Sequence, residues 1–157
     1  MLPDDVPVLA AILEASVEAL TGDDYSEAQQ AAWIAIADDE PAFAARLRDA
    51  LTLVGTRDGA PVGFASLKGA DQIDMIYVHP DATGLGLGSM LCDALEKLAS
   101  ARGATALVAE VSDNAQVFFA KRGFVPTQRN TRALNGEWLA NTTMRKSLTD
   151  PISNGTP

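Results

Sequence analysis

The chain has 157 residues, 47% of them hydrophobic, and a formal net charge of −9 at pH 7. This length suits one domain with a real hydrophobic core, and the negative charge argues against a nucleic-acid partner. A single cysteine, Cys92, excludes an internal disulfide framework, and the sequence contains neither a signal peptide nor a long apolar span. We therefore expect a cytoplasmic protein with no membrane association.

The first third of the chain has helical patterns. Apolar residues recur at helical spacing after the acidic start Pro3-Asp4-Asp5, and Gly22 ends that pattern. Ser26 and Gln29 then form a capping-box pattern that opens a second helix. We expect three helices here, at residues 3–22, 26–36 and 41–50.

Strand patterns dominate the rest, interrupted by two helices. Asp58-Gly59 marks a hairpin turn, and Asn135-Gly136 joins the last two strands. The polar tail carries two prolines, and we expect it to be disordered at residues 149–157, which leaves a single domain at 1–148. The expected strands are 51–56, 61–67, 73–78, 105–111, 124–133 and 137–146, with helices at 87–101 and from residue 114.

The most informative segment runs from Met75 to Ser89, where an apolar strand turns through alternating glycines into an amphipathic helix. Glycine permits positive φ and close approach of an anion to the main chain. The free N–H groups and the dipole at a helix start attract phosphate. Ser89 replaces the last glycine of the dinucleotide fingerprint, and no P-loop lysine follows. The segment therefore predicts a pyrophosphate site of another kind, or else a glycine-rich turn without a ligand; its glycines are Gly84, Gly86 and Gly88.

These residues resemble the Gln/Arg-x-x-Gly-x-Gly/Ala signature of the GNAT superfamily of N-acetyltransferases, which falls here on residues 83–88. Thr83 stands where the family usually has Gln or Arg, and Leu85 where Lys or Arg is frequent, so we expect main-chain amides to do most of the cofactor binding. A second block, residues 114–124, resembles the family's Asn-x-x-Ala-x-x-Phe-Tyr-x-Lys-x-Gly-Phe segment. The resemblance implies acetyl-CoA as cosubstrate, no metal, and these cofactor-binding residues: Ile76, Tyr77, Val78, Thr83, Gly84, Leu85, Gly86, Leu87, Gly88, Ser89, Asn114, Phe118, Phe119 and Lys121.

The resemblance also implies the fold, an α/β (α+β) arrangement with a central mixed, mostly antiparallel, splayed sheet and helices on both faces. The family usually opens with a short strand before its first helix, and only Met1 and Leu2 remain here to supply it. We expect that first edge strand to be missing or rudimentary, through either a misplaced start codon or a genuine truncation. An unpaired edge would be available to another chain, which favours a homodimer.

Two carboxylates are candidate bases for the reaction that the resemblance implies, direct attack of an amine on the thioester. The amine must be neutral to attack, so a carboxylate acting directly or through water is expected. Asp74 is the first candidate, on one strand face with Gln72 and Ile76 by alternation, and Glu110 is the second. A structural, solvated or salt-bridged role is an equal alternative for each. In the family a backbone N–H near the splay supports the developing oxyanion.

The usual proton donor is missing, because relatives often carry Tyr where this chain has Phe119. Water, Tyr77 or Tyr25 could protonate the leaving sulfur, or a thiolate with a pKa of about 8.5 could depart unprotonated. Loss of the acid altogether would leave a non-catalytic acyl-CoA-binding regulator, the alternative to an N-acetyltransferase acting on a small-molecule amine.

A cluster at the second helix is a candidate for contact with the acceptor. Gln29 and Trp33 share a helix face, and Tyr25 lies one turn earlier. Helices at this point in the family cover the acceptor pocket. We expect these three residues either to contact the acceptor or merely to pack.

Overall fold

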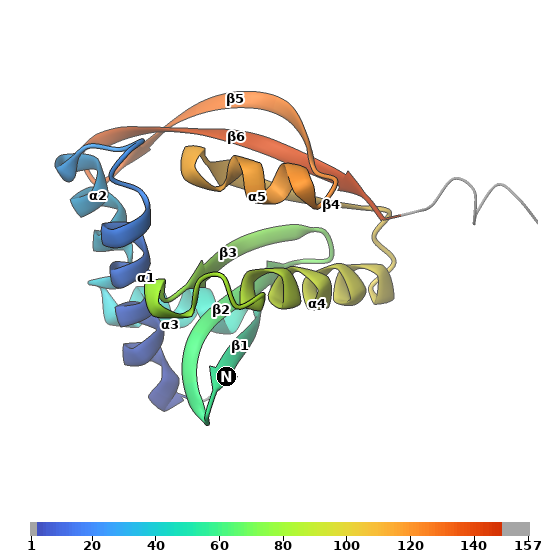
Figure 1. Cartoon of the computed structure of the whole chain (residues 1–157), viewed down its shortest axis with the longest axis horizontal. Coiled ribbons are helices and arrows are strands. Elements are labelled where there is room, and N and C mark those ends of the chain that lie inside the picture. The colour runs from blue at the N-terminus through green and yellow to red at the C-terminus, as the bar shows by residue number, and fades with distance from the viewer. Residues whose placement is uncertain (1–2, 149–157) are drawn as a thin grey trace, which may run out of the picture.

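The computed structural model describes residues 3–148, which form a six-stranded sheet with helices on both faces (Figure 1). The strand order is β1-β2-β3-β4-β6-β5. Only β3 and β4 pair in parallel, so the sheet is mixed and mostly antiparallel, which confirms the expected fold class. The strands are β1 (Leu51–Arg57), β2 (Ala60–Lys68), β3 (Gln72–Val78), β4 (Ala106–Ser112), β5 (Val125–Leu134) and β6 (Glu137–Ser147).

Two hydrophobic cores lie on opposite faces of this sheet. On one face, Leu9 and Leu13 of α1 and Phe43 of α3 pack against Phe64 and Met75 of the strands. On the other face, α4 and α5 cover a separate core (Figure 1). The helices are α1 (Val6–Leu20), α2 (Glu27–Ile34), α3 (Glu40–Asp49), α4 (Leu87–Ala101) and α5 (Gln116–Lys121), with short 3-10 turns at Pro3–Asp5, Ala35–Ala37, Pro80–Ala82 and Asp113–Ala115.

The sheet opens between its two parallel strands. β3 and β4 are paired only through Gln72 with Val108 and Ile73 with Ala109. Beyond Ile73 the two strands are no longer paired, so the β3 main chain on that side is left without a strand partner. This is the splay that the family resemblance implied.

A β-bulge in β3 changes which residues share a face. Ser66 of β2 pairs with Met75 and its neighbour Leu67 pairs with Ile73, so Asp74 is the extra residue. The Asp74 side chain meets Arg46 of α3, whereas Ile76 packs into the core beneath α4. The expectation from simple alternation, that Asp74 and Ile76 share a face, is therefore wrong, because an inserted residue resets the two-residue period.

The sheet ends at β1, and no strand precedes α1 within the described part of the chain. Met1 and Leu2, the residues left for a first edge strand, lie outside the described residues, as does the tail 149–157. Within residues 3–148, none of the helices has the length and apolar character needed to cross a membrane.

Candidate active site

The glycine loop, residues 83–88, joins β3 to α4 through two residues with positive φ. Gly84 has φ +81° and Gly86 has φ +80°, and a Cβ at either position would meet no atom within 4 Å. Backbone conformation is therefore what requires glycine there. Gly88 lies within α4 and does not have the positive φ that glycine permits in the loop. A Cβ at position 88 would lie 3.4 Å from the Phe118 ring.

Residues 83–88, the glycine loop, include no cationic side chain. The Thr83 hydroxyl donates a 2.8 Å hydrogen bond to the Pro80 carbonyl, within its own turn. Leu85 is largely exposed, at 58% of its surface. Because α4 runs for 15 residues from Leu87, its free N–H groups and dipole remain the attraction for a phosphate.

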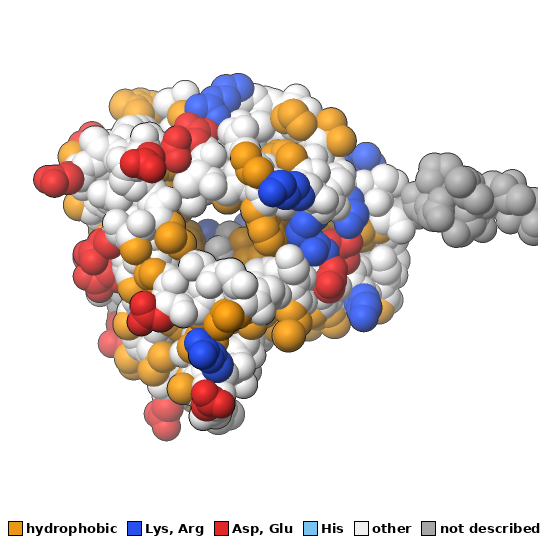
Figure 2. All heavy atoms as spheres, in the orientation of Figure 1, with side chains coloured by type: hydrophobic (Ala, Val, Ile, Leu, Met, Phe, Trp, Pro, Cys, Tyr) orange, Lys and Arg blue, Asp and Glu red, His pale blue; other side chains and the backbone are white. Residues whose placement is uncertain are grey.

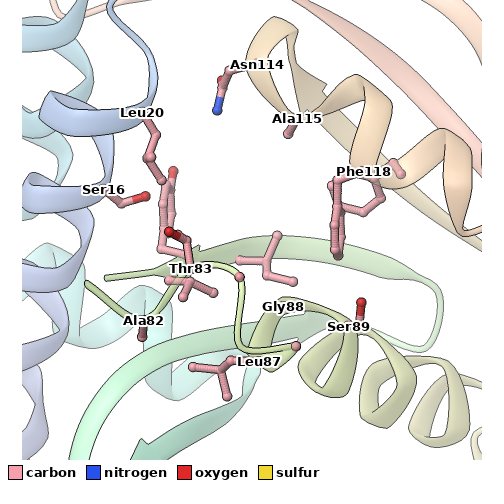
Figure 3. Close-up of a pocket in the computed structure, with 16 residues that line it drawn as sticks. Ser16, Leu20, Ala82, Thr83, Leu87, Gly88, Ser89, Asn114, Ala115 and Phe118 are labelled. Carbon is pink, nitrogen blue, oxygen red and sulfur yellow. The ribbon is translucent and has the colours of Figure 1, made fainter. Parts of the chain in front are cut away.

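A cavity of about 430 Å³ extends from the glycine loop into the splay. Figure 3 shows the Ser16 hydroxyl and the Asn114 amide pointing into this space, from α1 and from the 3-10 turn before α5. Figure 2 shows the hollow at the centre of this face. Of the 14 expected cofactor residues, only Leu85 and Lys121 do not line it. The lining residues from that set are Ile76, Tyr77, Val78, Thr83, Gly84, Gly86, Leu87, Gly88, Ser89, Asn114, Phe118 and Phe119.

Four further lining residues escaped the sequence analysis: Ser16, Leu20, Ala82 and Ala115. Ser16 did carry a signal, since it is a polar residue beside an apolar stripe and is 8% exposed. The other three are apolar, and nothing in their local pattern separates them from core positions.

A second cavity, of about 90 Å³, lies between the diverging strands and is lined by residues 73–77 of β3 and 109–112 of β4. Trp33 of α2, Asp74 of β3 and Glu110 of β4 contribute to its wall. The two cavities share four lining residues: Ile76, Tyr77, Ala115 and Phe119. They therefore meet at one point, where the strands diverge.

The two candidate bases have different surroundings. Both oxygens of Asp74 accept hydrogen bonds from Arg46, from Nε at 2.8 Å and from the second terminal nitrogen at 3.1 Å. Glu110 accepts from Arg132 through one oxygen only, at 2.5 Å. Glu110 thus keeps one oxygen that no protein donor occupies among residues 3–148, and its side chain is 40% exposed against 13% for Asp74.

The hydroxyl groups of the two tyrosines also differ. Tyr77 accepts a 2.8 Å hydrogen bond from the indole nitrogen of Trp33, and burial raises the pKa of its phenol. Tyr25 donates to the Ala140 carbonyl at 2.5 Å and accepts from the Asp113 N–H at 3.0 Å. The Tyr25 hydroxyl therefore connects β6 with the turn before α5.

The side chain of Gln29, like the hydroxyl of Tyr25, is hydrogen-bonded to main-chain groups. Its side-chain nitrogen donates to the Trp138 carbonyl at 2.7 Å, and its oxygen accepts from the Ser26 N–H in the predicted capping box. Of the three expected acceptor contacts, only Trp33 lines either cavity. No group of three or more potential metal ligands occurs in the described range 3–148.

An ionic network fixes the helix that follows the glycine loop. Glu96 of α4 accepts from Lys146 of β6 at 2.7 Å and from Arg122 at the end of α5 at 2.8 Å, and Arg122 also binds Asp93. Burial opposes ionisation of Glu96, but these two cations outweigh it and hold its pKa below the usual range. The network joins α4 to the α5–β6 half of the molecule.

A splayed mixed sheet, a glycine loop that opens a helix, and a cavity reaching from that loop into the splay define the class of acyl-CoA-dependent N-acetyltransferases. The chain belongs to this class by sequence as well: residues 21–148 match the family model described as acetyltransferase (GNAT) domain. It is therefore a GNAT-family, acetyl-CoA-dependent N-acetyltransferase, and the predicted family is confirmed.

Three relatives show how far the similarity extends. The uncharacterized N-acetyltransferase YafP of Escherichia coli (strain K12) is 32% identical over 143 residues, covering 91% of this chain and 90% of YafP. A crystal structure of a GCN5-related N-acetyltransferase from Rhodopseudomonas palustris has 65% identity and a TM-score of 0.93, over 94% of this chain and 92% of that one. The PaiA N-acetyltransferase of Thermoplasma acidophilum, solved with coenzyme A, shares the fold at 21% identity and a TM-score of 0.76, over 94% and 95% of the two chains.

Proposed function

We propose that the enzyme transfers the acetyl group to a primary amine of a small molecule, by direct attack of the amine in a ternary complex. The observation that carries this proposal is the meeting of the two cavities at Ile76, Tyr77, Ala115 and Phe119. One cavity leads from the glycine loop and the other is lined by two carboxylates. Two substrates entering from opposite sides would therefore meet without an acyl-enzyme carrier.

The cofactor would be held mainly by main chain. Gly84, Gly86 and the first N–H groups of α4 suit the pyrophosphate, and the unpaired side of β3 at residues 76–78 suits the amide-containing arm. When bound, acetyl-CoA supplies an activated thioester. The reaction forms a C–N bond and breaks the C–S bond, whose electron pair leaves on sulfur, so one proton must leave the amine and one must reach the sulfur.

For removal of the amine proton we favour Glu110 over Asp74, the first candidate from sequence. A base needs a free lone pair directed at the amine or at a bridging water. Glu110 lines the second cavity and has an oxygen free of protein donors within residues 3–148, whereas Arg46 occupies both oxygens of Asp74. Asp74 would then orient α3 and add negative potential near the amine.

For protonation of the sulfur we favour Tyr77. Phe119 lines both cavities but has no proton to give, and the hydroxyl of Tyr25 is engaged with Ala140 and Asp113. Tyr77 lines both cavities, and its raised pKa keeps the phenol protonated at neutral pH. Glu110 would release the proton of the amine to solvent. The Tyr77 phenolate would take up a proton from solvent, so the protons balance.

Charge around the acceptor side supports a cationic substrate. Residues 1–45 contain no Lys, Arg or His, and Figure 2 shows acidic side chains gathered over α1 and α2. Such a field raises the local concentration of cations. Among the expected acceptor contacts, Trp33 is the one whose side chain faces the second cavity, while Tyr25 and Gln29 would support the wall behind it.

Thiol release from acetyl-CoA with a panel of primary amines, with mass spectrometry of the products, tests this function. We expect an N-acetylated product and intersecting double-reciprocal plots, as a ternary complex requires. Parallel plots, or enzyme acetylated in the absence of amine, would overturn direct transfer.

A further inference from the structure

An aromatic chain crosses the splay on the side of α2. We call it the aromatic bridge and define it as Tyr25, Trp33 and Tyr77. The ring centroids of Tyr25 and Trp33 are 5.3 Å apart and those of Trp33 and Tyr77 are 6.4 Å apart, both edge to face. Tyr77 belongs to β3. The Tyr25 hydroxyl, in contrast, is hydrogen-bonded to Asp113, which follows β4, and to Ala140, which lies on β6. The bridge therefore connects the two halves of the sheet where their strands are unpaired.

The hydrogen bond within the bridge determines where the Tyr77 proton can go. An indole N–H is a donor only, so the Trp33 nitrogen occupies a lone pair of the Tyr77 oxygen, at 2.8 Å. The phenolic proton must then point elsewhere, and no acceptor among the described residues takes it. The Tyr77 ring is also packed against Phe64, at 5.6 Å between centroids, which restricts its movement.

We propose that Trp33 is a positioning residue that holds the Tyr77 hydroxyl so that its proton is presented where the two cavities meet. This inference rests on the proposed role of Tyr77 as proton donor. Trp33 and Tyr77 both line the second cavity, and Tyr77 also lines the first. A donor held at that point can reach the leaving sulfur, and its orientation is fixed before either substrate binds.

The charges near Tyr77 are consistent with this role. Arg46 from α3 and Asp74 from β3 act on the phenol in opposite directions, and they are bonded to each other. Burial raises the pKa of Tyr77, whereas the Trp33 hydrogen bond lowers it. Trp33 therefore stabilises the phenolate that exists after the proton has been given, and so assists the donation as well as the geometry.

The first test reads the hydrogen bond without any turnover. The chain has two tryptophans, Trp33 and Trp138, so a ¹H–¹⁵N spectrum of the free enzyme contains two indole signals. We expect slow solvent exchange for Trp33 and fast exchange for Trp138, whose side chain is largely exposed. In Tyr77→Phe the Trp33 signal should exchange about 2- to 10-fold faster, since a hydrogen-bonded donor is freed. Equal exchange in the wild type and Tyr77→Phe would overturn the proposal.

The second test is a double-mutant cycle on the rate. Trp33→Phe keeps an aromatic ring and removes the N–H, and we expect kcat to fall about 2- to 10-fold, the worth of one hydrogen bond, with KM for acetyl-CoA unchanged. In the Tyr77→Phe background the same change should have no further effect on kcat. Trp138→Phe is the matched control and should leave kcat unchanged. If Trp33→Phe does not fold, a benzothienylalanine at position 33, which has the same shape but no N–H, replaces it.

Several results would count against these proposals, and they differ in which of them they refute. An unchanged kcat in Trp33→Phe, or additive losses in the double variant, would overturn the positioning role alone. If the Trp33 indole of the wild type is protected but kcat is unchanged in Tyr77→Phe, both the positioning role of Trp33 and the role of Tyr77 as proton donor would be overturned. Absence of amine acetylation by the wild type would refute the proposed function, while the indole exchange would still report the bond.

Discussion

The side chain of Leu87, the first residue of α4, packs directly over Gly63 of β2. A Cβ added at position 63 would lie 2.9 Å from Leu87 Cδ2 and 3.1 Å from the Tyr77 carbonyl oxygen. Leu87 covers Gly55 of β1 in the same way, with an added Cβ 2.6 Å from its Cδ1. The two glycines therefore let the start of α4, and the glycine loop with it, approach the sheet closely.

Gly63→Ala should destabilise the protein and weaken cofactor binding together. The Leu87 side chain can rotate away, but the Tyr77 carbonyl belongs to β3 and cannot move alone, so overpacking should cost about 1–3 kcal/mol. The free energy of unfolding in urea and the calorimetric affinity for acetyl-CoA measure the two effects. Gly22→Ala is the control, since its Cβ would meet nothing closer than 3.6 Å. Unchanged stability in Gly63→Ala would show that the contact is easily relieved.

Gly86→Ala should lower acetyl-CoA affinity about tenfold. A non-glycine residue at φ +80° costs about 1–2 kcal/mol, and relief of that strain would turn the loop amides away from the phosphate. Gly59→Ala is a close control, because Gly59 has φ +82° and an equally open Cβ position, but lies in the β1–β2 hairpin. Both variants should lose similar stability, and only Gly86→Ala should lose affinity. Equal affinities of Gly86→Ala and Gly59→Ala for acetyl-CoA would mean that the loop does not hold the cofactor.

Glu110→Gln should lower kcat at least about 100-fold, the usual contribution of a general base. Asp74→Asn should lower kcat less than about tenfold, because Asp74 takes no proton in this scheme and its ion pair with a 41% exposed Arg46 contributes little to stability. Steady-state kinetics with saturating acetyl-CoA separates the two carboxylates. The opposite order, a large loss in Asp74→Asn and a small one in Glu110→Gln, would restore the ranking expected from sequence.

Local signals were enough to predict most of the elements. Asp58-Gly59 and Asn135-Gly136 both have positive φ at each residue, at 53° and 82° and at 47° and 88°, and both join paired strands as expected. The helix after the glycine loop has the predicted bounds, Leu87–Ala101, because apolar spacing marks its length and Gly86 marks its start. These features depend on neighbours within a few residues, and a sequence displays such neighbours directly.

The arrangement of the site was harder to predict, because its determinants are far apart in the chain. Asp74 is turned toward α3 by a bulge that depends on pairing with β2, and its partner Arg46 is 28 residues away. Trp33 and Tyr77 are separated by 44 residues, and no local pattern pairs them. The family resemblance supplied the cofactor residues, most of which line one cavity, but it could not rank the acid and base, because that ranking depends on which donors each group meets in the fold.

Cys92 provides a prediction about pH. Burial, chiefly, raises the pKa of this thiol to about 11 from 9.0, and its side chain, on α4, is fully buried in the core that this helix covers. Because thiolate is the reactive form, a thiol reagent at pH 8 should label the native protein only at the rate of global opening. Cys92 is the single cysteine, so labelling detected by mass spectrometry reports this site alone. Rapid labelling of the folded enzyme would contradict its burial.

The same thiol should make stability fall at alkaline pH. Between pH 9.0 and about 11 the unfolded chain releases the Cys92 proton while the folded chain retains it, so the unfolded state binds fewer protons and the free energy of unfolding decreases as pH rises. A shift of this size corresponds to about 2 kcal/mol across that window. Tyr25 and Tyr77, whose pKa values burial also raises, contribute in the same direction above pH 10. Cys92→Ala removes only the thiol, so the difference between the urea stabilities of wild type and Cys92→Ala should shrink as pH rises from 9.0 to 11. A difference that stays constant over this range would mean that the thiol ionises equally in both states.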